Sequence, residues 1–494
     1  MSYHDKLHKI REAMKAMEDL VQKNLNENEI ENEIEKDHDT YPNGCIPIET
    51  EMAMKDFQDI AENIVVNRED LETSIEKFNL DQARVFKKIT STIESDDKIL
   101  RLFVSGFGGT GKSFLIENVV KWNKCVRNKD TAVTAPTGIA AFNIKGLTIH
   151  RLLQLPVKQG ETPPYKALSA PAIKEIRKTL QNVDVIIIDE ISMVSNIIFL
   201  YIHLRLCEIF NTNNSADPFF GKINIILFGG LLQLPPVKED FPFIQVSKEK
   251  LVNNVGGMDS CDLWGLFEYD ELTINMRQKN DKEYSELLSR LRLGFSTNED
   301  IKLLNSRKIE FSSNDREVIV QEMCSYLENL PEDTVFLLPT RHMCHTFNKA
   351  MLDRLQSEEI YLIAQDTFNC SKTLKKKVDQ ILVDDETDQS GIERLITIKV
   401  GAKIRITRNI DVSVGLVNGA LGRIISIAKD THGQVREIKV RLNDTKREHA
   451  LERLDFKFIA MDAVCVIRKQ FPIRLSYGIS IHSSQELSLN YCGI

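Results

Sequence analysis

Residues 106–113 have the glycine content and the spacing of a phosphate-binding loop. Their sequence, Gly-Phe-Gly-Gly-Thr-Gly-Lys-Ser, fits the pattern G-x-x-x-x-G-K-[ST], in which the glycines let backbone N–H groups converge on phosphate oxygens. Lys112 can neutralise the β- and γ-phosphates, and Ser113 can ligate Mg²⁺. We therefore predict that ATP and Mg²⁺ bind here, through Gly106, Gly108, Gly109, Thr110, Gly111, Lys112 and Ser113.

Two adjacent carboxylates, Asp189 and Glu190, follow the apolar run 183–188. The carboxyl end of a parallel strand is where ligands bind in an open α/β sheet. Asp189 is predicted to hold Mg²⁺ through water, and Glu190 to polarise the attacking water. Strands often end in acidic residues, so the pair alone does not indicate a site. It does so together with the phosphate loop, because that loop lacks both a carboxylate to hold the metal and a base.

Short apolar runs predict the strands that position these groups. A helical pattern over residues 114–122 follows the loop, which gives the strand–loop–helix context that the motif needs. Between residues 400 and 467 alternating runs are separated by Asn-Gly and His-Gly turns, which indicates a small antiparallel β module. We therefore predict an α/β chain. Its buried parallel strands are expected at 102–105, 131–134, 183–188, 223–228 and 335–338.

Composition narrows the class of protein. The chain has 494 residues, 42% of them hydrophobic and 28% charged, which excludes wholesale disorder and suggests several domains. No apolar run approaches the ~18 residues of a membrane helix. Nine scattered cysteines form no Cys-x-x-Cys pair, so we expect a reducing compartment and neither a zinc knuckle nor a disulfide framework.

The net charge of −8 is unevenly distributed. Residues 1–77 contain nine Lys and Arg against twenty Asp and Glu, a net charge of −11, whereas residues 78–494 carry +3. Acidic residues occupy nearly every second position of 27–39, so we expect residues 1–77 to be flexible. The acidity therefore does not exclude a polyanionic partner for the rest of the chain.

Several ordered segments between residues 78 and 489 resemble the PIF (petite integration frequency) family of DNA helicases, a RecD-related branch of superfamily one. The acidic pair begins one of them, Asp-Glu-Ile-Ser-Met-Val. The others are Phe-Asn-Leu-Asp-Gln at 78–82, Ala-Pro-Thr-Gly-Ile-Ala-Ala at 135–141, Thr-Ile-His at 148–150, Gly-Gly-Leu-Leu-Gln-Leu-Pro-Pro-Val at 229–237, Leu-Thr-Ile-Asn-Met-Arg-Gln at 272–278, Gly-Leu-Val-Asn-Gly-Ala-Leu-Gly at 415–422 and Ile-Ser-Ile-His-Ser-Ser-Gln at 479–485.

The resemblance implies two RecA-like P-loop NTPase domains with parallel sheets, which bind ATP between them and single-stranded DNA across their tops. It also implies a small wedge insertion and an SH3-like β insertion. The expected parts are an acidic N-terminal region at 1–77, a first RecA-like domain at 78–270 with the wedge at 155–182, a second at 271–399 and 468–494, and the SH3-like insertion at 400–467.

The resemblance also implies roles for single residues at the nucleotide. Gln82 would read the adenine, Gln233 would sense the γ-phosphate, and Gln485 would help to bind the nucleotide. Arg277 would cross from the second domain and stabilise charge on the transferring phosphoryl group. Gln82 alone would suggest only a polar residue at a helix start, and Arg277 alone an ordinary salt bridge.

On the DNA side, the resemblance places Thr137 and His150 on the path of the strand in the first domain. Thr340, His482 and Ser484 would be their counterparts in the second domain. Hydroxyl and imidazole groups can bind phosphate oxygens without reading sequence, as a translocating motor requires. Each of these residues alone would suggest a helix cap or a satisfied core residue.

Three departures from the family pattern open an alternative. Gly230 replaces an aspartate, Ser483 and Glu486 replace a lysine and a glycine, and the chain ends at Ile494 before a family segment with a second arginine. The expected function is an ATP-dependent 5′-to-3′ DNA helicase that acts in DNA repair, recombination or telomere maintenance. The alternatives are a truncated, catalytically impaired nucleic-acid-binding remnant and a P-loop ATPase with protein or metabolite partners.

The expected partners are single-stranded DNA and forked duplex DNA, bound by a monomeric motor with no membrane association. The first 23 residues contain Asp5, Glu12, Glu18 and Asp19, which argues against an acid-poor mitochondrial presequence. The nucleus is therefore the expected location, with the mitochondrion as the alternative.

Overall fold

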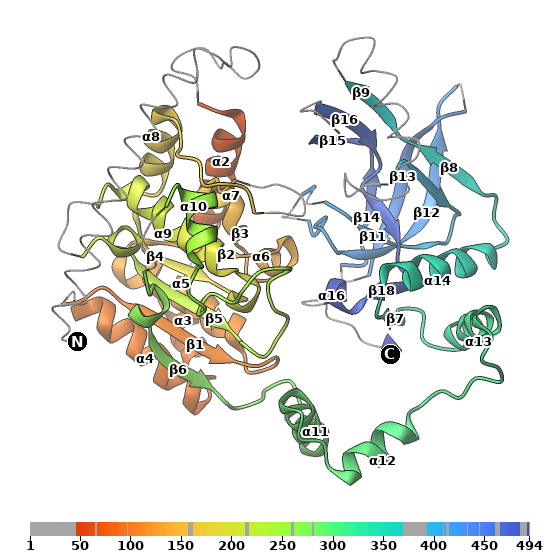
Figure 1. Cartoon of the computed structure of the whole chain (residues 1–494), viewed down its shortest axis with the longest axis horizontal. Helices are drawn as coiled ribbons and strands as arrows, with labels where there is room; N and C mark the ends of the chain where they lie inside the picture. The colour runs from red at the N-terminus through yellow and green to blue at the C-terminus, as the bar shows by residue number, and fades with distance from the viewer. Residues whose placement is uncertain are drawn as a thin grey trace. The chain divides into compact units, whose positions relative to one another are not determined.

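The computed structural model divides the chain into two compact units, Met1–Leu303 and Leu304–Ile494 (Figure 1). The domain boundary expected at residue 270 stays a prediction. Residues described by the structure are 46–64, 67–95, 97–156, 162–212, 217–257, 261–278, 281–368, 393–408, 410–411, 414–431, 433–443, 445–459, 465–484 and 492–493.

Unit 1 is built on a six-stranded parallel sheet with the strand order β3-β2-β4-β5-β1-β6. Side chains of β1 alternate between two hydrophobic cores, because Phe103 faces one core and Leu102 and Val104 face the other. Both faces of the sheet are therefore covered, as the apolar runs predicted. The strands are β1 (Arg101–Gly106), β2 (Asp130–Ala135), β3 (Leu147–Thr148), β4 (Val183–Ile188), β5 (Asn224–Gly229) and β6 (Glu268–Leu272).

Helices cover the two faces of this sheet. α2, α8 and α9 pack on one face, where Met54, Ile176 and Tyr201 are buried, and α3, α4 and α5 pack on the other. The helices of this unit are α2 (Ile48–Glu62), α3 (Arg68–Ile75), α4 (Leu80–Ser95), α5 (Lys112–Arg127), α6 (Gly138–Asn143), α7 (Ile149–Leu153), α8 (Ala170–Thr179), α9 (Asn196–Phe210), α10 (Lys248–Val255), α11 (Lys282–Leu293) and, across the unit boundary, α12 (Asn298–Ser306), with 3₁₀ turns η1 (Ile191–Met193), η2 (Phe219–Lys222) and η3 (Trp264–Leu266).

Two helices lie in the region that was expected to be flexible. α2 buries Met54 and Phe57 in the core of the sheet, and α3 buries Leu71 on the opposite face. The expectation is therefore wrong for residues 48–62 and 68–75, because their few apolar residues recur on one helix face. The most acidic stretch, 27–39, lies outside the described residues.

Unit 2 contains a small parallel sheet assembled from distant segments. Its strand order is β18-β7-β19, with β7 (Val335–Leu338) between β18 (Gly478–Ser480) and β19 (Cys492–Gly493). Phe336, Phe347 and Tyr477 form its buried core with residues of α13 and α14. The helices are α13 (Arg316–Glu328), α14 (Arg341–Asp353) and α16 (Ile481–Ser484).

The rest of unit 2 is antiparallel, as the alternating runs predicted. A five-stranded sheet has the order β14-β13-β12-β11-β17, and its last strand, β17 (Ile473–Leu475), lies beyond the range 400–467. The α/β class with an added β module is confirmed. The remaining strands are β8 (Ile360–Ile363), β9 (Gln365–Phe368), β10 (Leu395–Ile398), β11 (Lys403–Ile406), β12 (Leu421–Lys429), β13 (Val435–Leu442), β14 (Glu448–Leu451), β15 (Leu454–Ile459) and β16 (Cys465–Gln470).

None of the helices in the described part of the chain combines the length and the apolar character that crossing a bilayer requires.

Candidate nucleotide-binding site

The predicted phosphate loop connects β1 to α5, at the carboxyl edge of the first sheet. Gly109 and Gly111 have φ angles of +90° and +81°, which residues with a Cβ adopt only under strain. A Cβ on Gly111 would lie 2.3 Å from Nε2 of Gln82, and one on Gly109 would lie 2.8 Å from Cβ of Arg277. The two glycines therefore let two predicted site segments approach the loop closely.

Lys112 begins α5 and is held inside the loop. Only 8% of its surface is exposed, and its Nζ donates hydrogen bonds to the carbonyl oxygens of Gly106 (2.9 Å) and Phe107 (3.5 Å). Ser113, the next residue of the helix, is exposed. The first turn of this 16-residue helix has no acidic residue, so its N-terminus and the ammonium together favour an anion.

The acidic pair lies at the end of β4, as predicted. The backbone N–H of Asp189 donates to the carbonyl oxygen of Thr134 (2.8 Å), and its Oδ1 accepts from the N–H of Glu190 (2.9 Å). Burial raises the pKa of Asp189, while the charge of Lys112 and the bond from Glu190 oppose that rise. The structure thus brings the Asp189 carboxylate into electrostatic contact with the loop lysine.

These residues suit a magnesium ion that is bound together with a nucleotide. Among the described residues, no group of three or more His, Cys, Asp or Glu side chains could hold a metal ion alone. Mg²⁺ is usually held by one or two protein ligands and by the phosphates of its substrate. The hydroxyl of Ser113 and the buried carboxylate of Asp189 match that donor set, so both remain the candidates for holding the ion.

Gln233 lies on the loop that follows β5, beside the phosphate loop. Its N–H donates to the carbonyl oxygen of Gly230 (2.8 Å), and a Cβ on Gly230 would lie 3.1 Å from the carbonyl oxygen of Gly106. The side-chain Oε1 of Gln233 is buried and accepts no hydrogen bond from the described residues. Leaving such an oxygen unpaired costs about 1–3 kcal/mol. An unpaired buried acceptor is typical of a binding site in which a ligand completes the hydrogen bond.

Gln82 fits both interpretations given to it. Its Nε2 donates to the carbonyl oxygens of Thr110 (3.2 Å) and Gly111 (3.4 Å), so it contacts the phosphate loop. The side-chain Oε1 of Gln82 accepts from the backbone N–H of Asn79 (3.1 Å), and Oδ1 of Asn79 accepts from the backbone N–H of Gln82 (2.9 Å). This is the reciprocal pattern of a capping box. The adenine-reading role of Gln82 stays a prediction, as does that of Gln485, which lies outside the described residues.

Asp81, which the sequence analysis did not single out, anchors the segment that carries Arg277. Its Oδ2 accepts from the N–H (2.8 Å) and the hydroxyl (2.8 Å) of Thr273 and from the N–H of Ile274 (3.3 Å). Its Oδ1 accepts from Nη1 of Arg84 (2.8 Å). The sequence offers one signal for Asp81, its position directly before Gln82, because its partners Thr273 and Ile274 are distant in sequence.

Arg277 lies against the phosphate loop within the same unit. The N–H groups of Met276 and Arg277 donate to the carbonyl oxygen of Gly109 at 2.7 and 3.2 Å. Arg277 was expected to cross from the second domain; the structure places it in unit 1, where β6 extends to residue 272, pairs with β1 and directs the chain back to the loop. The Arg277 side chain is exposed, and within the described residues its guanidinium has no recorded hydrogen-bond partner.

A second arginine from the following helix touches the loop. The guanidinium carbon of Arg292, in α11, lies 4.6 Å from the ring centroid of Phe107. Such a stack is worth about 0.5–1 kcal/mol at an exposed site. α11 is thereby attached to the phosphate loop by a contact that sequence spacing does not reveal.

The Asp81 anchor leads to a test. We expect Asp81→Asn to loosen the segment around Arg277, lowering the free energy of unfolding by about 1 kcal/mol because the partly buried N–H groups of Thr273 and Ile274 lose a charged acceptor. ATP turnover should fall more than the affinity for ATP, since Asp81 contacts no part of the phosphate loop directly. Urea unfolding and steady-state ATPase kinetics measure the two effects, and Asp97→Asn, at an exposed position, is the matched control.

The pH dependence of stability gives an independent measurement on the same variant. Burial alone raises the pKa of Asp81, but its bonds from Thr273 and its pair with Arg84 outweigh burial, so the net pKa is lowered. A lowered pKa means a stabilisation that is complete above the unfolded value near ~4 and is lost as pH falls through the folded value. Wild-type protein should therefore lose more stability on acidification than Asp81→Asn; equal losses would contradict the anchor.

The residues predicted to contact DNA lie at carboxyl ends of strands. In unit 1, Thr137 follows β2 and caps α6 by accepting from the N–H of Ala140 (3.2 Å). His150 lies in α7, just after β3, where burial lowers the pKa of its imidazole. A lowered pKa keeps the ring neutral near pH 7, so it could donate one N–H to a phosphate.

In unit 2, Thr340 follows β7 and caps α14, accepting from the N–H of Met343 (3.2 Å). The hydroxyl of Ser484 donates to the carbonyl oxygen of Ile481 (2.7 Å) in α16, which follows β18. The side chain of His482 lies outside the described residues. Thr137 and Thr340 are thus helix caps, which was the alternative interpretation of each residue alone. The DNA-binding roles of all five residues stay predictions.

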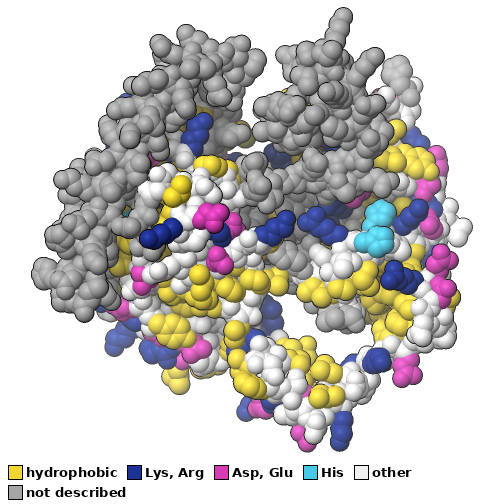
Figure 2. All heavy atoms as spheres, in the orientation of Figure 1, with side chains coloured by type: hydrophobic (Ala, Val, Ile, Leu, Met, Phe, Trp, Pro, Cys, Tyr) yellow, Lys and Arg dark blue, Asp and Glu magenta, His cyan; other side chains and the backbone are white. Residues whose placement is uncertain are grey.

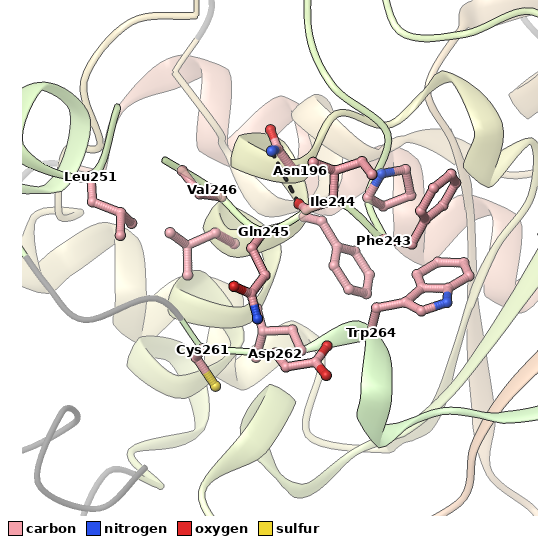
Figure 3. Close-up of a pocket in the computed structure, with 13 residues that line it drawn as sticks. Asn196, Phe243, Ile244, Gln245, Val246, Leu251, Cys261, Asp262 and Trp264 are labelled. Atoms are coloured by element: carbon pink, nitrogen blue, oxygen red, sulfur yellow. Dashed lines mark hydrogen bonds between the residues drawn. The ribbon is translucent and has the colours of Figure 1, made fainter. Parts of the chain in front are cut away.

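A separate cavity in unit 1 is too small to compete as a ligand site. It lies between α9 and the loop 242–246, where Phe243 and Trp264 are neighbours and Asn196 donates to the carbonyl oxygen of Ile244 at 3.1 Å (Figure 3). Its volume of about 30 Å³ is enough for one water molecule. The phosphate loop therefore remains the candidate functional site of this unit.

A phosphate loop after β1 of a parallel sheet, with carboxylates after β4, which β5 separates from β1, defines a P-loop NTPase of the RecA-like type. Two family models give the finer assignment: one described as PIF1-like helicase matches residues 77–301, and one described as the 2B domain of the DNA helicase Pif1 matches residues 389–427. Over these two ranges the chain matches the PIF1-like DNA helicases.

Relatives and solved structures agree with this assignment. The chain is 29% identical to ATP-dependent DNA helicase PIF1 of Danio rerio, over 79% of this chain and 53% of that protein, so it spans about half the length of this relative. It is 28% identical to Pif1 of Campylobacter jejuni, over 82% of this chain and 84% of that one. The crystal structure of Pif1 helicase from Candida albicans matches with a TM-score of 0.59 and 24% identity, over 84% of this chain and 87% of that one, which supports the fold.

Proposed function

We propose that this chain is an ATP-dependent DNA helicase that moves 5′ to 3′ along single-stranded DNA and separates duplex strands. The single observation that carries the proposal is the assembly of Lys112, Asp189 and Arg277 around one phosphate loop. The predicted DNA contacts at the carboxyl ends of strands in both units support the same function. The resemblance to the family is what adds the 5′-to-3′ direction.

The residues of the site divide the chemistry between them. Lys112 and the N-terminus of α5 bind the phosphates, and Ser113 and Asp189 hold Mg²⁺, which when bound neutralises charge on the transferring phosphoryl group. Glu190 polarises the attacking water, and Arg277 stabilises the charge that develops in the transition state. Gln233, whose side-chain oxygen is unpaired, senses the γ-phosphate.

The proposed partners are single-stranded and forked duplex DNA. A solved Bacteroides Pif1, 22% identical with a TM-score of 0.57, is bound to single-stranded DNA, and another Pif1 structure describes two coordinating helicases at forked DNA. We propose that this chain translocates as a monomer. DNA repair, recombination or telomere maintenance, in the nucleus or alternatively the mitochondrion, are the proposed settings.

The decisive test is ATP hydrolysis by the purified full chain with and without single-stranded DNA. We expect hydrolysis to need Mg²⁺ and to rise at least ~10-fold with a single-stranded oligonucleotide, because a motor that moves along DNA couples its catalytic step to binding of the strand. A forked substrate with a 5′ single-stranded arm should be unwound, and one with only a 3′ arm should not. Hydrolysis that is indifferent to DNA would contradict the proposal and favour a P-loop ATPase with another partner.

A second candidate is a nucleic-acid-binding protein with impaired catalysis. Gly230, where the family has an aspartate, favours it, as does Glu486, whose charge would repel a nearby phosphate. Salt-dependent binding of single-stranded DNA without measurable turnover would select this candidate. Gly230→Asp tests it further, since a Cβ there would meet the Gly106 carbonyl oxygen at 3.1 Å, a contact that a small shift of the loop accommodates.

A further inference from the structure

We propose that three arginines of unit 2, Arg341, Arg405 and Arg474, form a binding site for one backbone phosphate of a nucleic acid. We call these residues the arginine cluster. The inference rests on the proposed function, because it names a new contact for the same DNA partner. Nothing in the family resemblance assigns a role to any of the three.

Strand pairing brings two members of the arginine cluster together. Arg405 of β11 lies directly opposite Arg474 of β17 in the antiparallel register. Ile404 and Ile406, which flank Arg405, and Ile473, which precedes Arg474, are fully buried in the core of the sheet, so the arginines occupy the other face. Side chains directly opposite each other have Cβ atoms about 4.5–5.5 Å apart, and like charges there are destabilising.

The third member stands at the start of α14. Arg341 is the first residue of this 13-residue helix, and the first turn contains no acidic residue. A cation at a helix N-terminus is unfavourable because the helix dipole is positive there. Arg341 is close enough to Arg405 for their charges to interact, and it directly follows Thr340, a predicted DNA contact. The site therefore combines three guanidinium groups with a helix N-terminus.

The acids around the arginine cluster do not balance it. Arg474 pairs with Glu393 at 3.5 Å. Arg405 is half-buried, and no hydrogen bond or ion pair of its guanidinium is recorded with the residues that the structure describes. Burial first, and then the charges of Arg474 and Arg341, lower the pKa of Arg405, although Cys344 and Glu393 partly oppose this. A half-buried cation without its own acid is costly unless a ligand supplies the negative charge.

Other basic residues on the same face of the sheet have protein partners. Arg423 pairs with Glu332 at 2.9 Å, Arg441 pairs with Glu448 at 2.7 Å, and Nζ of Lys403 donates to the carbonyl oxygen of Thr334 at 2.9 Å. The chain thus neutralises or satisfies neighbouring cations but leaves Arg405 to an external anion. In the region of α14 and β11, Figure 2 shows Lys and Arg side chains near a histidine on the surface.

The expected anion is a phosphodiester. Guanidinium groups bind phosphate through two parallel N–H···O bonds, and such contacts hold a strand without reading its sequence. Free phosphate has the same chemistry, but the position of the arginine cluster beside Thr340, at the carboxyl end of β7, favours the DNA backbone. The two sources of phosphate are separated in the experiment.

The test is Arg405→Met in the full chain, which keeps an unbranched apolar stem and removes the guanidinium and its charge. We expect the affinity for a single-stranded oligonucleotide to fall about 3- to 10-fold at 100 mM salt, with the slope of log affinity against log salt smaller by about one. Arg436→Met, at an exposed position of β13, makes the same change of net charge and should leave the affinity within about twofold. Arg405→Lys should keep part of the affinity, since the charge remains without the fork.

Melting without DNA separates a binding role from a structural one. Removing Arg405 relieves like-charge repulsion, so the Tm of Arg405→Met should equal or exceed that of wild type, whereas a structural arginine would lower it. If wild type binds DNA and Arg405→Met binds it equally well, the inference is overturned and the proposed function stands. If inorganic phosphate raises the Tm of wild type alone while DNA affinities are equal, the ligand is free phosphate and the inference is likewise overturned. No DNA binding by wild type overturns the proposed function itself.

Discussion

Lys112→Ala should reduce ATP turnover at saturating single-stranded DNA at least ~10³-fold, which is the scale for removing a charge that clamps the transferring phosphoryl group. The physical reason is the position of the ammonium, which is buried and bonded to the carbonyl oxygens of Gly106 and Phe107. No other described lysine occupies the loop, so no neighbour can replace it. Steady-state release of phosphate measures the effect.

A control in the same helix makes this result interpretable. Lys121 also lies in α5, but it pairs with Glu117 at 3.0 Å, away from the loop, so Lys121→Ala should keep most of the turnover. The affinity of Lys112→Ala for single-stranded DNA without nucleotide should remain within about threefold, because Lys112 is not on the predicted DNA path. DNA-stimulated hydrolysis that survives Lys112→Ala would contradict both the assigned site and the proposed motor.

Arg277→Ala should also reduce turnover about 10³- to 10⁵-fold, the range for an arginine finger. The backbone of Arg277 is fixed by Gly109 and by Oδ1 of Asn275, which accepts from its N–H at 2.9 Å. Truncation of the side chain therefore leaves the segment in place and removes only the guanidinium. The affinity for ATP should change far less than turnover, because the charge is needed chiefly in the transition state.

Two further variants separate charge from geometry at this position. Arg277→Lys should recover only a small part of the turnover, since lysine lacks the planar fork. Arg68→Ala removes an exposed arginine that pairs with Glu72 in α3, and it should be silent. Unchanged turnover in Arg277→Ala would contradict the arginine-finger role and leave an ordinary salt bridge, the alternative interpretation of its sequence.

Elements whose signal is local could be predicted well from the sequence. β4 and β7 begin and end at the predicted residues, because a buried apolar run stops where a turn or polar residue follows. The phosphate loop and the Asp189–Glu190 pair were found for the same reason, since their spacing along the chain is itself the signal.

Features that depend on distant partners could not be predicted. In the sequence, Asp81 looks like any acidic residue near a helix start. Its role as an anchor depends on a hydrogen bond from Thr273, which the strand order brings beside it. The helical segment 48–62 looked flexible because net charge outweighed a sparse apolar face that only tertiary packing stabilises. Arg405 was passed over because an unpaired charge can be recognised only when its neighbours are known.

The contact between Gly109 and the arginine segment has a mechanical consequence. A peptide bond is planar, so the Gly109 carbonyl and the Thr110 N–H are opposite edges of one rigid plate. If that N–H turns toward an arriving phosphate, the carbonyl must turn away from the N–H groups of Met276 and Arg277 that it now accepts. The orientation of this one peptide plane therefore couples the phosphate loop to the backbone of Met276 and Arg277.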